Sequence, residues 1–263
     1  MKYPIIRPSL PASDEILSQV EEVLASGMVT TSAYTRRFES VVSEFLGVEQ
    51  VVAVSSCTSG LMLVLRALGA TGEAVMPSFT FCATGLAAMW AGLVPVFCDV
   101  RSDTLTIDVD SARSVSGDAT RVSMPVPVFG VPCDSDAIAQ LAAERDMIVL
   151  YDSAQALGAA YKGKRLGGFG HAEVFSLSPT KVITSVEGGL IATNDGDLAA
   201  TLRRMRDYGK SPDGKDITAM GLSARFSELH AIVGVHNLAR AETLIAGRHR
   251  RIDDFRQRLG DLA

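Results

Sequence analysis

Short apolar runs alternate with stretches of helical periodicity along this chain of 263 residues. Several of the runs are apolar throughout and rich in Val, Ile and Phe, which is typical of strands buried on both faces of a mostly parallel sheet. We therefore expect strands at 51–55, 74–77, 94–99, 121–129, 147–152, 172–177 and 188–193. Helices are expected at 13–27, 35–46, 59–69, 82–92, 134–145, 196–208, 225–240 and 243–259.

This alternation predicts an α/β fold of three layers, α/β/α, with helices on both faces of a mostly parallel sheet. Two helix starts have a clear signal, because Asp134 precedes one apolar stripe and Asp195 precedes another. The polar segment 209–222 is marked by glycine and proline, and it predicts a long loop.

Composition narrows the class of protein. Hydrophobic residues make up 47% of the chain, which is enough for a sizeable core, and the formal net charge of -5 argues against a general nucleic-acid surface. No apolar run is long enough to span a bilayer, and Met1–Pro4 lack the layout of a signal peptide. These features predict a cytoplasmic protein that binds neither nucleic acid nor membrane.

Cysteine and histidine patterns point to no metal site. The four cysteines form no CxxC pair, and no histidine stands beside them at metal-ligand spacing. Each lies in or next to an apolar stretch, so we expect small buried thiols in a reducing compartment. They are Cys57, Cys82, Cys98 and Cys133.

A lysine and a carboxylate suggest cofactor chemistry. Lys181 follows the apolar run that ends at Phe175, stands among Ser and Thr residues, and precedes Glu187-Gly188-Gly189. An amine in this setting can form a Schiff base with an aldehyde, although an ordinary surface lysine is the alternative. Upstream, Asp152 ends a buried-looking strand, where a carboxylate is costly unless it is paired. A protonated pyridine would be such a partner, and an unrelated ion pair or helix cap would serve as well. Together the two residues predict a site for pyridoxal 5'-phosphate (PLP).

Two further segments fit the same cofactor. Ser55–Gly60 connects a strand to a helix, so its amides and hydroxyls could hold a phosphate at the positive helix end. The commoner meaning of such a turn is an N-terminal cap. Phe81 follows another strand and could stack on a ring, or belong to the core. The order of phosphate turn, aromatic residue, carboxylate and lysine gives the set its weight.

Ordered motifs extend over nearly the whole chain. They include Ser55–Leu61, Met76–Phe81, Pro95–Val100, Pro127–Gly130, Asp152–Gly158, Phe175–Lys181 and Glu187–Gly189. With these motifs the chain resembles the DegT/DnrJ/EryC1/StrS family of sugar aminotransferases. The resemblance implies the aspartate aminotransferase fold of type I PLP enzymes.

The resemblance also implies roles for individual residues. Lys181 would bind the cofactor as a Schiff base and transfer protons, and Asp152 would form a salt bridge with the pyridine nitrogen. Other residues would contact the cofactor: Thr58, Ser59 and Ser176 at the phosphate, Gln155 near the ring hydroxyl, and Phe81 on the ring face. Glu187 and Thr31 are expected to assist substrate binding.

The implied reaction is transamination of a nucleotide-linked keto-sugar, with glutamate as the amino donor, in a homodimer whose subunits share active sites. Related dehydratases carry histidine in place of the Schiff-base lysine, so Lys181 argues against that activity. A Rossmann dehydrogenase is a weak competitor, because Gly167-Gly168-Phe169-Gly170 is a poor glycine fingerprint that precedes a strand.

The sequence departs from the family pattern at three points. Cys57 replaces a common glycine. Ser223 stands where the family often has an asparagine, and that asparagine reaches the phosphate of the partner subunit. The resemblance divides the chain into a PLP-binding large domain at 1–240 and a helix at 241–263, which leads toward a small C-terminal domain that the sequence lacks. A truncated, non-catalytic protein of PLP-enzyme fold with a binding or regulatory role is therefore the alternative.

Overall fold

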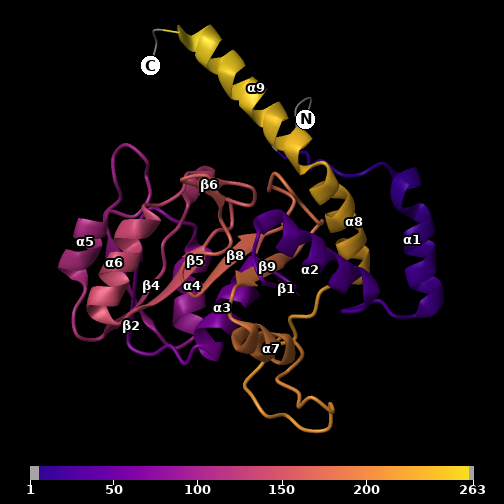
Figure 1. Cartoon of the computed structure of the whole chain (residues 1–263), viewed down its shortest axis with the longest axis horizontal. Coiled ribbons are helices and arrows are strands. Elements are labelled where there is room, and N and C mark those ends of the chain that lie inside the picture. The colour runs from indigo at the N-terminus through magenta and orange to yellow at the C-terminus, as the bar shows by residue number, and fades with distance from the viewer. Residues whose placement is uncertain (1–5, 261–263) are drawn as a thin grey trace.

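The computed structural model describes residues 6–260, so the Met1–Pro4 start lies outside the described residues. A seven-stranded sheet with the strand order β1-β9-β8-β5-β4-β2-β3 forms its centre (Figure 1). The strands are β1 (Gln50–Val54), β2 (Glu73–Pro77), β3 (Val94–Cys98), β4 (Thr120–Ser123), β5 (Ile148–Asp152), β8 (Ala172–Ser176) and β9 (Gly189–Thr193). Only β9 runs antiparallel to its neighbours in this sheet, which confirms the predicted mostly parallel arrangement.

Helices cover both faces of the sheet, as predicted for a three-layer fold. One layer contains α3 (Cys57–Ala67), α4 (Cys82–Trp90) and α7 (Gly196–Met205). The opposite layer contains α2 (Ala33–Leu46), α5 (Val109–Val115) and α6 (Ser135–Arg145), with α8 (Glu228–Ala239) packed on α2 and α1 (Ser13–Ser26) on α8. Strand side chains serve the two layers alternately, since Val52 and Val54 face the α3 side while Val51 and Ala53 face α2.

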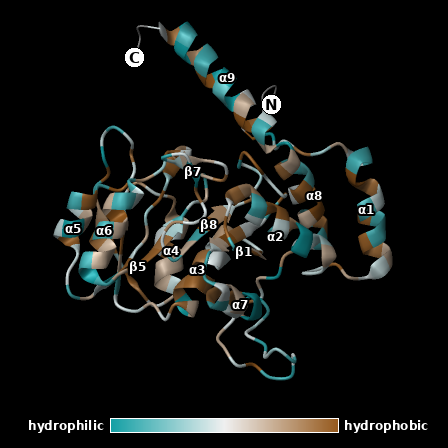
Figure 2. Ribbon diagram, viewed as in Figure 1, coloured by the Kyte–Doolittle hydropathy of each residue, from teal (hydrophilic) through white to brown (hydrophobic). Residues whose placement is uncertain are grey.

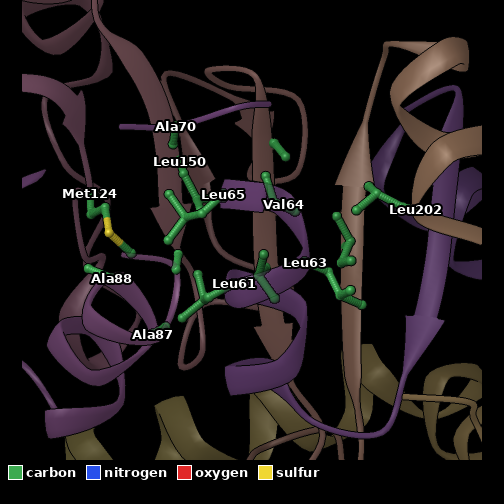
Figure 3. Close-up of a cluster of buried hydrophobic side chains, with 14 of the residues drawn as sticks. Leu61, Leu63, Val64, Leu65, Ala70, Ala87, Ala88, Met124, Leu150 and Leu202 are labelled. Atoms are coloured by element: carbon green, nitrogen blue, oxygen red, sulfur yellow. The ribbon is translucent and has the colours of Figure 1, made fainter. Parts of the chain in front are cut away.

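The core under α3 is built from one helix face against the middle of the sheet. Leu61, Val64 and Leu65 of α3 lie beside Leu150 of β5 (Figure 3), and all four are fully buried. Their helical spacing of three and four residues turns them toward one face, so α3 is fixed over the sheet along its length. This packing sets where the first turn of α3 points.

Several element boundaries differ from the predictions. The strand expected at 121–129 ends at Ser123, because Pro125 and Pro127 have no N–H group to continue the ladder. Helix α3 begins at Cys57, two residues before the predicted start, because Ser56 caps it. The short helix α5 and the hairpin of β6 (Ala160–Tyr161) and β7 (Lys164–Arg165) were not expected, since each is too short to show a period.

Helix α9 (Ala241–Leu259) extends away from the sheet (Figure 1) and is largely hydrophilic (Figure 2). It starts beside the N-terminal segment, because Arg240 donates hydrogen bonds to the Ser9 hydroxyl and the Leu10 carbonyl. The predicted domain division at residue 240 stays a prediction. In the part of the chain from 6 to 260, no helix is both long and apolar enough to cross a membrane.

A buried ion pair joins three elements on the α2 side. The Arg206 guanidinium, at the end of α7, lies 2.5 Å from the Glu39 carboxylate of α2. Glu39 also accepts the Ala53 N–H at 2.9 Å, while Arg206 donates to the Ala53 carbonyl at 2.8 Å. Both side chains are less than a tenth exposed, so each charge depends on the other for compensation.

Replacing Glu39 by alanine should therefore destabilise the protein by about 3–5 kcal/mol, because Arg206 would be left as an uncompensated buried charge. Urea denaturation measures the free energy of unfolding. Glu44→Ala, at an exposed position of the same helix, is the matched control and should change it by less than about 0.5 kcal/mol. Equal effects of the two substitutions would contradict the role of the pair.

Candidate active site

A cavity of about 690 Å³ opens at the carboxyl ends of the parallel strands. Its walls come from the segments that follow β1, β2, β4, β5 and β8. Loops at this edge of a parallel sheet converge, so side chains distant in the sequence can meet there. Ligands of α/β proteins bind at this edge for that reason.

Most of the predicted site residues line this cavity. They are Thr58, Phe81, Asp152, Gln155, Ser176, Lys181 and Glu187. Ser59 and Thr31 are not part of the lining. Ser223 also lies outside it. Its neighbour Arg225 forms an ion pair with Asp207 at 2.8 Å. The roles assigned to all these residues stay predictions.

The turn before α3 caps the helix and also contains backbone N–H groups that can donate hydrogen bonds. The Ser59 N–H donates to the Ser56 hydroxyl at 3.0 Å, and the Ser56 N–H donates to the Ser59 hydroxyl at 3.1 Å. This reciprocal cap occupies the Ser59 side chain and explains why it turns away from the cavity. The N–H groups of Cys57 and Thr58 have no acceptor among the described residues, so the positive end of α3 is open to an anion.

Close packing fixes that turn against β9. A Cβ atom on Gly189 would lie 2.5 Å from the carbonyl carbon of Ser56 and 2.6 Å from the Cys57 nitrogen. No larger residue fits there without moving the backbone of the turn. Glycine at position 189 therefore holds the donor groups of α3 at the mouth of the cavity.

Asp152 is the buried charge of the site. It is 4% exposed at the end of β5, and it accepts hydrogen bonds from the Thr84 hydroxyl at 2.6 Å and the Ala154 N–H at 3.3 Å. Burial raises the pKa of this carboxyl above 3.8, against the opposing effects of these hydrogen bonds and of the Lys181 charge. No ion pair within residues 6–260 includes Asp152.

No sequence pattern indicates a functional role for Thr84. It lies one turn into α4, a helix composed otherwise of apolar and small residues, and it is fully buried. Threonine hydroxyls in helices often donate to the carbonyl one turn back, as Thr84 does to Phe81. The residue type alone therefore does not point to a functional site. Only the fold brings it to Asp152.

Cys57 contributes a thiol next to this carboxylate. Its sulfur lies 3.7 Å from an Asp152 oxygen and 3.6 Å from the Val174 carbonyl oxygen. Burial of the sulfur, reinforced by the nearby Asp152 charge, raises the pKa of the Cys57 thiol well above its usual range. Each of the four cysteines is unpaired, and Cys82 is exposed, against the expectation that all are buried.

Lys181 lies in the loop that joins β8 to β9. The loop is closed by hydrogen bonds from the Ser185 N–H and the Thr184 hydroxyl to the Leu177 carbonyl, at 3.0 and 2.8 Å. The Lys181 N–H donates to the Ser178 carbonyl at 3.0 Å, so the lysine backbone is held in a tight turn. The half-buried lysine side chain reaches the cavity from this fixed base.

Phe81 and Gln155 also line the cavity. Phe81 is 75% exposed at the start of α4, so the predicted stacking residue presents its ring outside the core. The Gln155 side-chain oxygen accepts the Phe129 N–H at 2.5 Å. Phe129 has a positive φ of 55°, which is uncommon outside glycine, and this hydrogen bond helps to hold it there.

The sequence and the fold both match one family. The model of the DegT/DnrJ/EryC1/StrS aminotransferase family matches residues 12–263. The chain belongs to this family. GDP-perosamine synthase from Caulobacter vibrioides is 33% identical over 228 residues, which cover 86% of this chain and 62% of that enzyme.

Solved structures show the same fold. The crystal structure of DesI in the presence of its TDP-sugar product superposes with a TM-score of 0.92 at 35% identity, covering 97% of this chain and 65% of DesI. The X-ray crystal structure of S. venezuelae DesV in complex with a ketimine intermediate gives a TM-score of 0.90 at 30% identity, covering 98% of this chain and 72% of DesV. The chain thus spans less than two thirds of GDP-perosamine synthase and of DesI.

The residues around the cavity fit PLP. Asp152 is a buried carboxylate that forms no ion pair within the described residues, and a pyridinium N–H would supply the partner that its charge lacks. The open N–H groups at the start of α3 suit a phosphate, and Lys181 supplies an amine in the same cavity. Each functional part of the cofactor therefore has a matching group.

We expect the buried Asp152 charge to make stability depend on pH. Because the folded-state pKa is raised above 3.8, the protonated carboxyl stabilises the fold, and this contribution is lost as the pH rises through the raised pKa. Asp152→Asn carries no charge, so without cofactor its free energy of unfolding should improve relative to the parent between pH 4 and pH 7. Urea denaturation at both pH values measures this difference.

Asp99→Asn is the control for this comparison, because Asp99 also follows a strand but is exposed. Its free energy of unfolding, relative to the parent, should be the same at both pH values. A constant difference for Asp152→Asn as well would show that burial does not disfavour the Asp152 charge.

Proposed function

We propose that the protein uses PLP to transfer an amino group from an amino acid to the keto group of a nucleotide-linked sugar. The observation that carries this proposal is the meeting of Lys181, Asp152 and the open end of α3 in one cavity. Family membership supports aminotransfer, and GDP-perosamine synthase and the TDP-sugar product of DesI support a nucleotide-linked sugar.

In this proposal, bound PLP supplies an electrophilic aldehyde and an electron-accepting ring. Asp152 would face the pyridine nitrogen and would favour its protonated form. The Cys57 and Thr58 N–H groups and the Ser176 hydroxyl bind the phosphate, and Phe81 covers the ring face. The Lys181 amine would hold the aldehyde of the cofactor and would carry protons during amino transfer.

Glutamate is the proposed amino donor, and Glu187 and Thr31 are proposed to assist substrate binding. Glu187 lies at the cavity wall, which supports a contact with substrate, whereas Thr31 lies outside that wall and has weaker support. Transfer of the amino group from the donor and its transfer to the keto-sugar would both use the Lys181 amine, one after the other. Donor and acceptor must therefore enter the same cavity one after the other.

We also propose a homodimer with shared sites. An apolar hollow of about 510 Å³ adjoins the cofactor cavity, and Thr80 and Phe81 line both. Around it Leu86, Met89 and Phe97 are 46%, 60% and 55% exposed. Large apolar side chains gathered beside a site fit a subunit interface better than a solvated surface.

Replacing Lys181 by alanine should abolish the covalent cofactor adduct and all amino transfer, because no other amine lines the 690 Å³ cavity in the described chain. Absorbance of the protein with PLP, borohydride reduction and peptide mass mapping measure the adduct, and glutamate with candidate keto-sugars measures transfer. Lys215→Ala, whose side chain is 80% exposed in the long loop, should behave as the parent. A reducible adduct in Lys181→Ala would refute the assignment.

The same experiment separates the proposed enzyme from the non-catalytic alternative. A parent protein with the Lys181 adduct and transfer from glutamate to a keto-sugar is the result that the proposal requires. A folded parent protein that forms no adduct would favour a binding or regulatory role.

A further inference from the structure

A second cavity, of about 710 Å³, adjoins the first. Ile6, Pro179, Thr180 and Lys181 line both, so the two spaces meet at the lysine. Its other walls come from the N-terminal segment 7–9, from Val182 and from the first turns of α9. The proposed cofactor residues Asp152, Ser176 and Thr58 line only the first cavity, so the second offers separate space for a ligand.

The walls of the second cavity carry positive charge only. Arg7, Arg248 and Arg251 line it together with Lys181, and its described lining contains no Asp or Glu. Arg248 and Arg251 stand three residues apart on α9, so they share a helix face with Leu244 and Gly247.

The three arginines of the second cavity have no carboxylate partner among the described residues, unlike some other arginines of the protein. Arg206, Arg225 and Arg165 each pair with a carboxylate. Arg7, Arg248 and Arg251 form no ion pair with any residue between 6 and 260. Like charges that converge on one hollow repel each other, and a bound anion would remove that cost.

A smaller hollow of about 340 Å³ connects this basic cavity to the cofactor site. Phe129, Gln155, Lys181 and Arg248 line it, so it shares Gln155 with the cofactor site, Arg248 with the basic cavity, and Lys181 with both. The Phe129 ring is 69% exposed and offers an apolar surface of the kind on which a sugar ring can pack. The three spaces meet at Thr180 and Lys181.

We propose that Arg248 and Arg251, with Arg7, bind the diphosphate of the nucleotide-linked substrate and so place its sugar in the small hollow beside Lys181. The planar guanidinium groups match phosphate oxygens in bidentate geometry, and a diphosphate carries the charge of more than one arginine. This inference rests on the proposed function, because it assigns the substrate of that same site.

The test compares diphosphate binding to the parent protein and to Arg248→Gln/Arg251→Gln by isothermal titration calorimetry at low salt. The probes are inorganic pyrophosphate, UDP, GDP and dTDP, with glutamate as the competing small anion. The double variant should raise the Kd for the diphosphates at least about tenfold, because each arginine that is removed takes its charge-assisted hydrogen bonds to phosphate oxygens with it. Added salt should weaken binding to the parent and reduce this difference.

Arg250→Gln is the matched control, since Arg250 is exposed on the same helix and lines none of the three spaces. It removes one positive charge from the same helix and should leave the Kd within about twofold of the parent value, because a charge outside the site is screened. An unchanged Kd in the double variant, or an equal loss in Arg250→Gln, would overturn the diphosphate assignment. So would loss of glutamate binding without loss of diphosphate binding.

Borohydride mapping of the Lys181 adduct in the same samples separates this inference from the proposed function. The double variant should retain the adduct, because its arginines lie outside the cofactor cavity. If the parent forms the adduct but binds no diphosphate, the inference fails and the cofactor assignment stands. If the parent binds diphosphate through these arginines without forming the adduct, the proposed function fails and the basic cavity stands as an anion site.

Discussion

The burial of the Asp152 carboxylate at the end of β5 is the constraint on which the site depends. Taking this group out of water is costly, and the Thr84 hydroxyl and the Ala154 N–H offset only part of the cost. A position that disfavours a charge strengthens the interaction of that charge with any cation that enters the cavity. The packing of α4 and β5 therefore prepares one side of the cavity for a cationic ring before any ligand is present.

The rest of the cavity is positioned by rigid elements rather than by flexible side chains. Helix α3 is fixed over the sheet by Leu61, Val64 and Leu65, and Gly189 lets its first turn approach β9. Lys181 rises from a loop closed on itself by backbone hydrogen bonds. A site mounted on strand ends and a helix start keeps its geometry because moving one group requires moving a packed element.

Continuous apolar runs predict most of the strands, because strands of a parallel sheet are buried on both faces. The polar residues that follow these runs mark where the strands end. The strand end at Asp152 and the motif around Lys181 predict one shared site, and the structure brings both residues to one cavity. The strand predicted at 121–129 extends past the observed end of β4, since apolar residues continue through Pro125 and Pro127. The Ser59 hydroxyl accepts the Ser56 N–H in the helix cap, and its contact with a phosphate stays a prediction. Thr84 has no local signal, because its contact with Asp152 depends on which distant segment lies opposite.

The thiol of Cys57 bears on the selectivity of the site for one nucleophile over another. Thiolates add readily to aldehydes, so an ionised cysteine beside Lys181 would compete with the amine for the same carbonyl carbon. Burial and the Asp152 charge raise the pKa of the Cys57 thiol and keep the sulfur protonated at neutral pH. The carboxylate that orients a pyridine ring would thereby also suppress a rival addition, and give the cavity chemoselectivity for nitrogen over sulfur.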